Sequence, residues 1–329
     1  MKILHIAAGL PSKERPVQQP FIKSQIESLK KQDLDISVFE IKGYNSKFTY
    51  LKAIKEIKTM VAMDNYNVIH AHYSYCGIIS YLAKTNKPIV LSLMGSDLLG
   101  MRNKSGQISF RGKVDKIITA FAVNKVDHVI VKSESMKSLI RTGVPVSVIP
   151  NGVDFKIFNP RNTVESRIKL GLNQNDFIIL FFGKENSIVK NYQLAFQAVN
   201  KFKLAYKMND TVFINPYGIA HEKVADYMNA ADVMLLTSFY EGSPNVVKEA
   251  MACNLPIIST DVGDVKEIIR DTDYCFMTGY STEEISENLK IIYEKRERSN
   301  GRKNIEHLKD DIIARKIINI YEKVLSNKS

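Results

Sequence analysis

The sequence has no long apolar run and few cysteines. No apolar stretch reaches the ~18 residues that a helix needs to span a bilayer, so we expect no transmembrane segment. The three cysteines, Cys76, Cys253 and Cys275, are far apart and odd in number, which favours a reducing compartment over a disulfide framework or a metal site. The short apolar stretch at residues 3–8 is typical of a first strand and not of a signal peptide, so we expect a cytoplasmic protein.

The charge of the chain is unevenly distributed. At 329 residues, with 45% hydrophobic residues, the chain is long enough for two domains with separate cores. Residues 1–150 contain 22 lysines and arginines against 11 aspartates and glutamates, whereas residues 151–329 contain 24 of each. No nucleic-acid-binding motif accompanies the basic half, so an anionic membrane surface is favoured over nucleic acid as its partner. An ordinary lysine-rich surface is the alternative.

Apolar runs typical of strands alternate with helical patterns along the whole chain. This alternation predicts an α/β protein with parallel sheets flanked by helices. In the first half, the strand candidates are residues 3–8, 36–40, 68–71, 89–93, 128–131 and 146–149. In the second half, they are residues 177–182, 211–214, 233–236, 257–259 and 274–277. Residues 150–154, PNGVD, read as a turn that joins the halves, so the predicted domains are 1–152 and 153–329.

One predicted helix of the first half carries a regular row of lysines. Its expected apolar stripe consists of Leu51, Ile54, Ile57 and Val61. On the neighbouring face, lysines repeat every three residues at Lys52, Lys55 and Lys58. This basic ridge is typical of a solvated face, and it is the first place where we expect lipid contact.

The segment from Glu241 to Glu249, EGSPNVVKE, carries the most chemical information. It follows a predicted buried strand, and Ser243 is the expected N-cap of a helix that starts with Pro244 and ends near residue 253. This helix places Asn245 and Glu249 on one face, with Glu241 in the loop before it. Carboxylates around a helix N-terminus, whose free N–H groups attract anions, suit a sugar joined to a diphosphate.

Two glutamates separated by seven residues, in this strand–loop–helix context, resemble the donor-site motif of the family 4 retaining glycosyltransferases. The continuation PIISTDVG at residues 256–263 and the PNGVD turn, followed by Phe158 and Pro160, resemble the same family. The resemblance covers nearly the whole chain. It implies the GT-B architecture, in which two Rossmann-like domains with parallel sheets face each other across a cleft. It also implies that the last helix, at about residues 311–325, crosses back to the N-terminal domain.

The resemblance implies a role for each residue of the donor site. Glu249 would accept hydrogen bonds from the nucleotide ribose, and Glu241 would lie beside the donor sugar near the reacting carbon. The family uses an arginine and a lysine to hold the donor diphosphate, and Lys184 and Lys190 stand at those positions. Lysine supplies the charge but not the planar two-point geometry of arginine. The remaining expected donor-binding residues are Gly183 and, through their backbone N–H groups, Gly242, Ser243 and Asn245.

The first half offers three candidates for the acceptor side. Gly9 follows the first strand, where the lack of a side chain lets a ligand approach the backbone. His70 and His72 alternate along a strand and point to the same side, but as a zinc pair they lack a third ligand nearby. Many relatives have a histidine where Met94 stands, so Asp97 is the nearest polar candidate to orient the acceptor. The acceptor-side candidates are therefore Gly9, Asp97 and His72.

These patterns predict a retaining glycosyltransferase. It would move a sugar from a nucleotide-diphospho-sugar to a saccharide or lipid-diphosphate-linked acceptor, in the synthesis of cell-surface polysaccharide at the inner face of the membrane. Catalysis would consist of positioning and of electrostatic stabilisation of the departing diphosphate, without a metal or other cofactor. One alternative is a GT-B sugar-nucleotide 2-epimerase, which needs no acceptor. The other is a non-catalytic binding subunit, which is conceivable because Met94 and Lys184 differ from the residues usual in the family.

Overall fold

The computed structural model describes residues 1–12, 14–15, 18–42, 48–103 and 107–327. The chain divides into two compact units, which we describe separately. The N-terminal unit comprises Met1–Gly152 together with Asp310–Ser329, and the C-terminal unit comprises Val153–Lys309. In the described part of the chain, no helix has both the length and the apolar character needed to cross a bilayer.

The N-terminal unit contains a parallel sheet of six strands in the order β2-β1-β3-β4-β5-β6. Its strands are β1 Lys2–Ala7, β2 Asp35–Glu40, β3 Val68–His72, β4 Ile89–Ser92, β5 His128–Val131 and β6 Val146–Val148. Its helices are α1 Pro20–Lys30, α2 Phe48–Met63, α3 Ser74–Leu82, α4 Ser96–Leu99, α5 Phe110–Ala122, α6 Glu134–Lys137 and α14 Asp310–Ser326. The predicted strands are confirmed to within one residue at each end, because strands covered on both faces appear as nearly continuous apolar runs.

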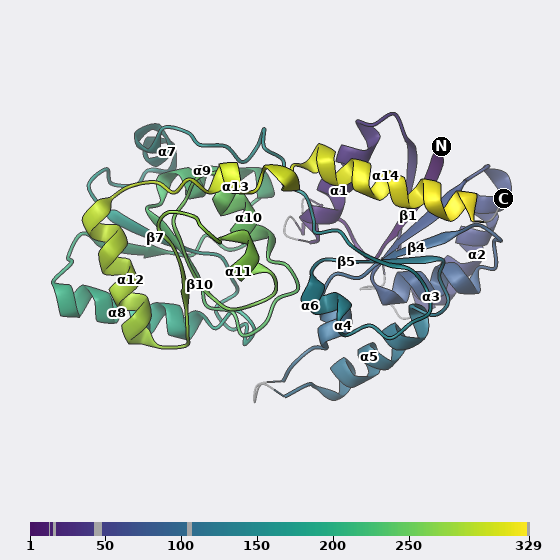
Figure 1. Cartoon of the computed structure of the whole chain (residues 1–329), viewed down its shortest axis with the longest axis horizontal. Coiled ribbons are helices and arrows are strands. Elements are labelled where there is room, and N and C mark those ends of the chain that lie inside the picture. Colours follow the sequence, from purple (N-terminus) through teal and green to yellow (C-terminus); the bar gives the residue numbers. More distant parts are fainter. Residues whose placement is uncertain (13, 16–17, 43–47, 104–106, 328–329) are drawn as a thin grey trace. The chain divides into compact units, whose positions relative to one another are not determined.

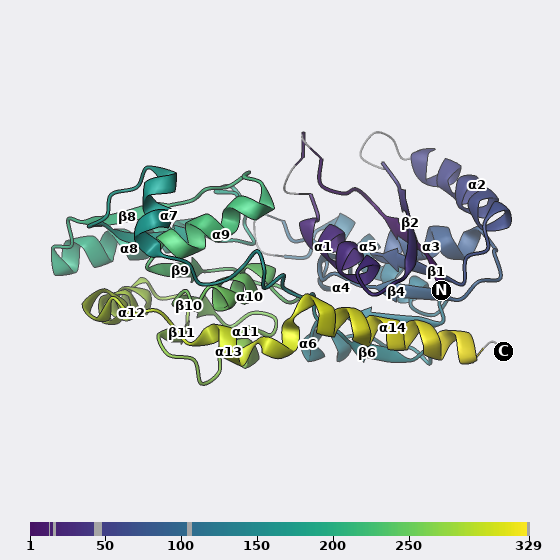
Figure 2. The ribbon, with the colours of Figure 1, turned by 90° about the horizontal axis from the view of Figure 1, so that it is seen from above.

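Helices cover both faces of this sheet. On one face, Leu4 and Ile6 of β1 join a core with residues of α2 and α3. On the other face, Ala7 packs with Ile22 and Ile26 of α1. Helix α14 lies along α1 (Figures 1 and 2), and Ser24 Oγ lies 3.3 Å from Asp310 Oδ2. The last helix of the chain therefore completes the N-terminal unit.

The predicted apolar stripe of α2 needs one correction. Ala53, Ile57 and Val61 are the buried residues of this helix, whereas Leu51 is 64% exposed. A helix that packs with a period of about 3.6 residues places Ala53, and not Leu51, one turn before Ile57. Leu51 therefore lies on the outer face of α2, next to Lys52.

The C-terminal unit contains a parallel sheet of five strands in the order β11-β10-β9-β7-β8. Its strands are β7 Phe177–Phe181, β8 Thr211–Ile214, β9 Val233–Leu236, β10 Ile257–Thr260 and β11 Cys275–Thr278. Its helices are α7 Thr163–Leu170, α8 Tyr192–Tyr206, α9 His221–Ala230, α10 Asn245–Ala252, α11 Val265–Ile268, α12 Thr282–Lys295 and α13 Gly301–Asn304, with a 3-10 turn at Glu306–Leu308. These strands too are confirmed to within one residue at each end.

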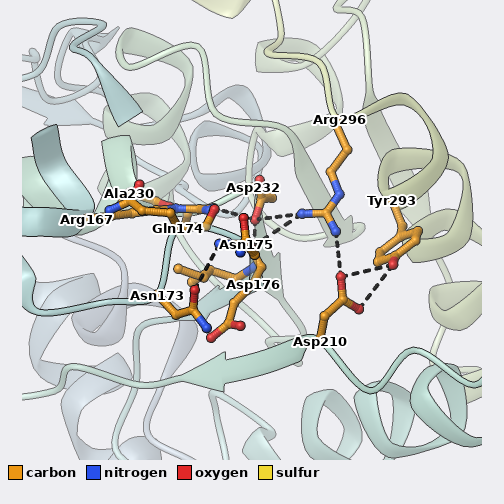
Figure 3. A network of polar contacts seen from close by, with 12 residues as sticks. Arg167, Asn173, Gln174, Asn175, Asp176, Asp210, Ala230, Asp232, Tyr293 and Arg296 are labelled. Atoms are coloured by element: carbon orange, nitrogen blue, oxygen red, sulfur yellow. Dashed lines mark hydrogen bonds and ion pairs between the residues drawn. The ribbon is translucent and has the colours of Figure 1, made fainter. Parts of the chain in front are cut away.

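A network of charged side chains fastens helices to the amino edge of this sheet (Figure 3). Asp232, just before β9, accepts hydrogen bonds from the Ile178 backbone N–H at 2.6 Å and from Arg167 Nη2 at 2.8 Å. Arg296 Nη2 donates to Asp210 Oδ2 at 2.9 Å. Asp210 and Asp232 lie directly before β8 and β9, at the end of the sheet where the strands begin. These charged side chains therefore stabilise the packing of the unit and do not belong to the ligand-binding end. The opposite edge, where the parallel strands end, is the edge at which such sheets bind ligands.

Candidate active site

Helix α10 begins at Asn245, one residue later than predicted, and Ser243 is not its cap. Pro244 takes the N-cap position, and no side chain caps this helix. The Ser243 hydroxyl instead donates to Asp264 Oδ2 at 2.7 Å and accepts from Lys248 Nζ at 3.0 Å. The predicted cap is wrong because a residue 21 positions further along the chain holds the hydroxyl. Ser243 thereby connects the loop before α10 to the loop after β10.

The Glu241 and Lys190 side chains, predicted to be catalytic, form an ion pair. Glu241 lies in the loop between β9 and α10, and its Oε1 accepts from Lys190 Nζ at 2.7 Å and from Ser238 Oγ at 2.9 Å. The Lys190 and Glu241 side chains are 28% and 18% exposed, so the pair is shielded but remains accessible to a ligand. Lys184 lies exposed in the same loop as Lys190.

The lack of a side chain at Gly183 allows the Lys190 side chain to pack directly against the backbone of residue 183. A Cβ atom at residue 183 would lie 2.8 Å from the Phe181 ring and 3.0 Å from Lys190 Cβ. The Asn215 side chain holds Gly183 in place through two hydrogen bonds, to its N–H at 3.3 Å and to its carbonyl at 2.9 Å. Any side chain at residue 183 would therefore displace Lys190 or Phe181.

Glu249 has a histidine partner that the sequence did not reveal. His221, the first residue of α9, places its Nε2 at 2.7 Å from Glu249 Oε1. The two side chains are 22% and 12% exposed, and the Phe158 ring lies 5.2 Å from the imidazole. The available signal was the position of His221 in the connection after β8, at the same sheet edge as the glutamates.

The loops after β9 and β10 are in close contact. Gly263 has a φ of +62°, and a Cβ atom there would lie 2.9 Å from the Gly242 carbonyl oxygen. Four strands thus place functional groups together at one edge: Gly183, Lys184 and Lys190 after β7, Asn215 and His221 after β8, Glu241, Gly242 and Ser243 after β9, and Gly263 and Asp264 after β10. Lysines and the start of α10 supply positive charge for an anion, and the two carboxylates can accept hydrogen bonds from hydroxyl groups.

In the N-terminal unit, Asp97 shapes the loop after β4. Its Oδ1 accepts hydrogen bonds from the backbone N–H groups of Met94 at 3.2 Å, Gly95 at 3.0 Å and Leu98 at 3.1 Å. Burial raises the pKa of Asp97 to about 6, although these hydrogen bonds act in the opposite direction. Gly95 has a φ of +116°, which glycine adopts readily. Asp97 therefore fixes the backbone beside Met94, and its role toward an acceptor stays a prediction.

Gly9 also has a backbone that requires glycine. Its φ is +103°, and the Gln18 side chain occupies the place where a Cβ atom would stand. The close neighbour of Gly9 in this structure is thus the amide of Gln18. The predicted approach of an acceptor to Gly9 would require that amide to move or to take part in the contact.

His72 belongs to a buried cluster, and the expectation that no third histidine lies nearby is wrong. Strand β1 pairs with β3 in register His5↔His70, which brings His5 beside both histidines. The ring nitrogens lie within 4.8 Å of one another, the one such trio in the described residues that could hold a metal ion. His5 Nδ1 lies 2.9 Å from His72 Nε2, and the rings of His70 and His72 stack at 4.5 Å. The three rings are therefore in contact with one another and form a buried polar network.

Helix α14 closes this network. The Tyr321 hydroxyl lies 2.6 Å from His70 Nδ1 and 3.4 Å from His5 Nε2, and His70 Nε2 lies 2.8 Å from Ser92 Oγ. Burial lowers the pKa of His5 to about 3 and lowers the pKa of His70 and His72 well below its usual range. The three imidazoles are therefore neutral, and His5 and His70 connect α14 to the sheet through Tyr321.

Two family models match the chain, one over most of its first half and one over most of its second half. The model described as Glycosyltransferase Family 4 matches residues 28–156, and the model described as Glycosyl transferases group 1 matches residues 167–295. The chain belongs to glycosyltransferase family 4. This confirms the family that was predicted from Glu241, Glu249 and the PNGVD turn. It also confirms the prediction that the protein is an enzyme of the transferase class.

Proteins of known name show the same relationship. A glycosyltransferase assigned to teichuronic acid biosynthesis in Bacillus subtilis (strain 168) is 26% identical over 88% of each chain. The UDP-Gal:α-D-GlcNAc-diphosphoundecaprenol α-1,3-galactosyltransferase of Escherichia coli is 24% identical over 64% of each chain. The solved structure of sucrose-phosphate synthase from Thermosynechococcus elongatus covers 99% of each chain with a TM-score of 0.80 at 17% identity. The family 4 glycosyltransferase described here has the GT-B fold, as predicted.

Proposed function

We propose that this glycosyltransferase takes its sugar from a nucleotide-diphospho-sugar and transfers it with retention at the anomeric carbon. The observation that carries the proposal is the convergence of Glu241, Glu249 and Lys190 at the carboxyl edge of one sheet. Lys190 and His221 lie 51 and 28 residues from Glu241 and Glu249 in the sequence, yet each contacts its glutamate at 2.7 Å.

In this proposal each group has a separate task. Glu249 accepts hydrogen bonds from the ribose hydroxyls, and His221 holds its carboxylate in place. Glu241 accepts hydrogen bonds from hydroxyls of the donor sugar. Lys190 and Lys184, with the first N–H groups of α10, stabilise the negative charge on the departing diphosphate. These groups already supply positive charge to the leaving group, so the proposal assigns no metal or other cofactor to the reaction.

The proposed acceptor is a saccharide, either free or linked through a diphosphate to a lipid. Two observations support a lipid-linked acceptor. The Escherichia coli relative carries a diphosphoundecaprenol acceptor in its name, and the basic excess of this chain lies in its first 150 residues. We place the enzyme in the cytoplasm, peripheral to the inner face of an anionic membrane, in the synthesis of cell-surface polysaccharide. Gly9, Asp97 and His72 remain the predicted acceptor-side residues.

The donor site is tested by comparing two variants with the wild type. Glu249→Gln should weaken nucleotide-sugar binding by about 1.5–3 kcal/mol, because the ribose loses a charged acceptor. Glu241→Gln should lower turnover more than affinity. Thermal shift and calorimetry with UDP-glucose, UDP-galactose, UDP-N-acetylglucosamine and GDP-mannose give the binding, and release of nucleoside diphosphate gives the turnover.

The same measurements separate the alternatives. Wild-type binding and turnover in both variants would refute the proposed donor site. Conversion of the donor to its 2-epimer without an acceptor would identify an epimerase. Tight donor binding without transfer to any saccharide or lipid-linked acceptor would identify a binding subunit.

A further inference from the structure

Helix α5 exposes three of its large apolar side chains, while its fully buried residues are small or polar and Val114 and Ile118 are half-buried. Phe110, Ile117 and Phe121 are 84%, 70% and 49% exposed. At 100° per residue, spacings of seven and four residues place these three side chains on one stripe of the helix. The buried residues of α5 are Gly112, Asp115, Thr119 and Ala122. The exposed apolar stripe is therefore unlike the polar outer face of an ordinary surface helix.

The contacts of its inner face prevent α5 from turning this stripe inward. A Cβ atom on Gly112 would run into the backbone of Met101. Thr119 Oγ1 donates to the Asp97 carbonyl oxygen at 2.9 Å, and Asp115 Oδ1 accepts from the Tyr75 hydroxyl at 2.8 Å. The exposed stripe is therefore a fixed feature of the N-terminal unit.

The charges around the stripe are of one sign. The exposed charged residues of α5 are Arg111, Lys113 and Lys116, all basic. The one acidic residue of the helix, Asp115, is buried against Tyr75. Apolar and aromatic side chains bordered by lysine and arginine are typical of helices that lie in the interface of an anionic bilayer.

The apolar surface continues onto α3, which contains no charged residue. Tyr81 and Leu82 of α3 are 39% and 43% exposed. Lys125 Nζ lies 5.6 Å from the Tyr81 ring and 5.4 Å from the Phe121 ring, so the two exposed rings share one lysine. An ammonium group beside two aromatic rings can meet lipid phosphate in the headgroup layer while the apolar parts of the rings enter deeper.

We propose that the stripe Phe110–Ile117–Phe121 of α5, with Tyr81 and Leu82 of α3, inserts into the headgroup region of an anionic bilayer. The inference rests on the proposed function, in which the acceptor is carried by a membrane lipid, and it names the surface that meets the lipid. Insertion by α5 is distinct from long-range attraction by the lysine ridge of α2. On that ridge Lys52 is already paired with Glu56 at 3.4 Å.

A single tryptophan tests the insertion, because the chain contains none. Ile117→Trp should show a blue-shifted emission, and quenching by brominated lipid, when vesicles of phosphatidylcholine and phosphatidylglycerol are added. Ile168→Trp, at a residue that is 68% exposed in the C-terminal unit, is the matched control and should show neither change. No shift at residue 117 with vesicles that bind the protein would overturn the proposal.

A polar triple variant tests the contribution of the stripe. Phe110→Gln, Ile117→Gln and Phe121→Gln together should lower the affinity for anionic vesicles by roughly tenfold or more. The control combines Val164→Gln, Ile168→Gln and Leu204→Gln, at residues that are 52%, 68% and 82% exposed in the C-terminal unit, and it should bind as the wild type does. Equal loss in both variants, or none in either, contradicts the assignment of this surface.

Donor binding is measured in the same variants, so that failure of this inference is distinguishable from failure of the proposed function. The triple variant of α5 should give the wild-type thermal shift with nucleotide-sugars and the wild-type rate with a soluble saccharide acceptor. A wild type that binds donor but no vesicles overturns the inference alone. A wild type that dimerises through this stripe, with loss of the dimer in the triple variant, shows a protein interface in its place.

Discussion

The pair of Lys190 and Glu241 shows how single residues carry the proposed chemistry. Each side chain reaches the other from a different loop, and Ser238 supports the carboxylate at 2.9 Å. A lysine held beside a departing diphosphate is worth several kcal/mol in the transition state, because the charge there develops in a site of low dielectric constant. Lys184, in the same loop, is exposed.

Lys190→Ala should therefore lower turnover by about two orders of magnitude. Lys184→Arg should keep or increase turnover, since a guanidinium group can bind two phosphate oxygens at once. Initial rates of nucleoside diphosphate release at saturating donor measure both effects. A folded Lys184→Arg protein without activity would show that this loop does not contact the diphosphate.

Lys248 is a second residue with a distinct expected effect. Its side chain is fully buried on α10, and its ammonium group bonds to Ser243 Oγ, which in turn bonds to Asp264. Lys248→Met should lower the free energy of unfolding by about 3 kcal/mol, because Asp264 then loses its nearby positive charge. Adding Asp264→Asn should restore part of that loss. Urea unfolding of both variants checks this, and additive losses would show that the two groups are independent.

At the scale of elements, the positions of the strands could be predicted from the sequence, but contacts between residues distant in the sequence could not. The strands of the described residues carry apolar or alternating apolar patterns that are visible in the local sequence. The start of α10 differs because Ser243 bonds to Asp264, a distant residue that no local pattern shows. His5 and His221 escaped notice for the same reason, since the β1–β3 pairing and the fold of α9 bring them to their partners.

The buried histidines beneath α14 make the stability of the N-terminal unit depend on pH. Above the unfolded pKa of about 6.5, His5, His70 and His72 are neutral in both states and pH has no effect through them. Below that value the unfolded chain takes up protons that the folded unit does not, because burial lowers the folded pKa of each group. Each histidine then lowers the free energy of unfolding by about 1.4 kcal/mol per pH unit. The three together lower it by on the order of 4 kcal/mol per pH unit.

Scanning calorimetry between pH 7 and pH 5 should show this loss as a falling transition temperature of the N-terminal unit. A variant with His72→Gln should show a shallower fall. His307→Gln, at an exposed histidine of the C-terminal unit, serves as the control and should leave the slope unchanged. A transition temperature that does not change with pH would mean that the cluster opens or protonates without cost.

At the scale of the whole molecule, the basic excess lies in one part of the chain. Residues 1–150 carry the excess, and residues 151–329 are balanced. Long-range attraction to an anionic surface should therefore belong to the N-terminal unit, whereas donor binding should belong to the C-terminal unit. The choice of Glu241 and Glu249 as candidates came from their spacing in a strand–loop–helix context and from the resemblance to the family, whereas the surface positions of the basic residues came from the fold.

Vesicle binding should weaken as the salt concentration rises, since the screening length falls from ~10 Å at 0.1 M to ~3 Å at 1 M. Replacing Lys52, Lys55 and Lys58 together by glutamine should weaken binding to anionic vesicles and leave nucleotide-sugar affinity unchanged. Vesicle flotation at several salt concentrations measures the first effect, and calorimetry measures the second. Equal binding to neutral and anionic vesicles would argue for a soluble acceptor.

The position of α14 in the sequence has a consequence for synthesis on the ribosome. The N-terminal unit needs Tyr321 to cover His5 and His70, yet this helix is translated only after all of the C-terminal unit. Until then, the nascent N-terminal unit has an uncovered polar cluster on one face of its sheet. A chain that stops before Asp310 would keep His5 and His70 exposed to solvent on that face. We expect chaperones and proteases to recognise such a chain by this exposed polar cluster.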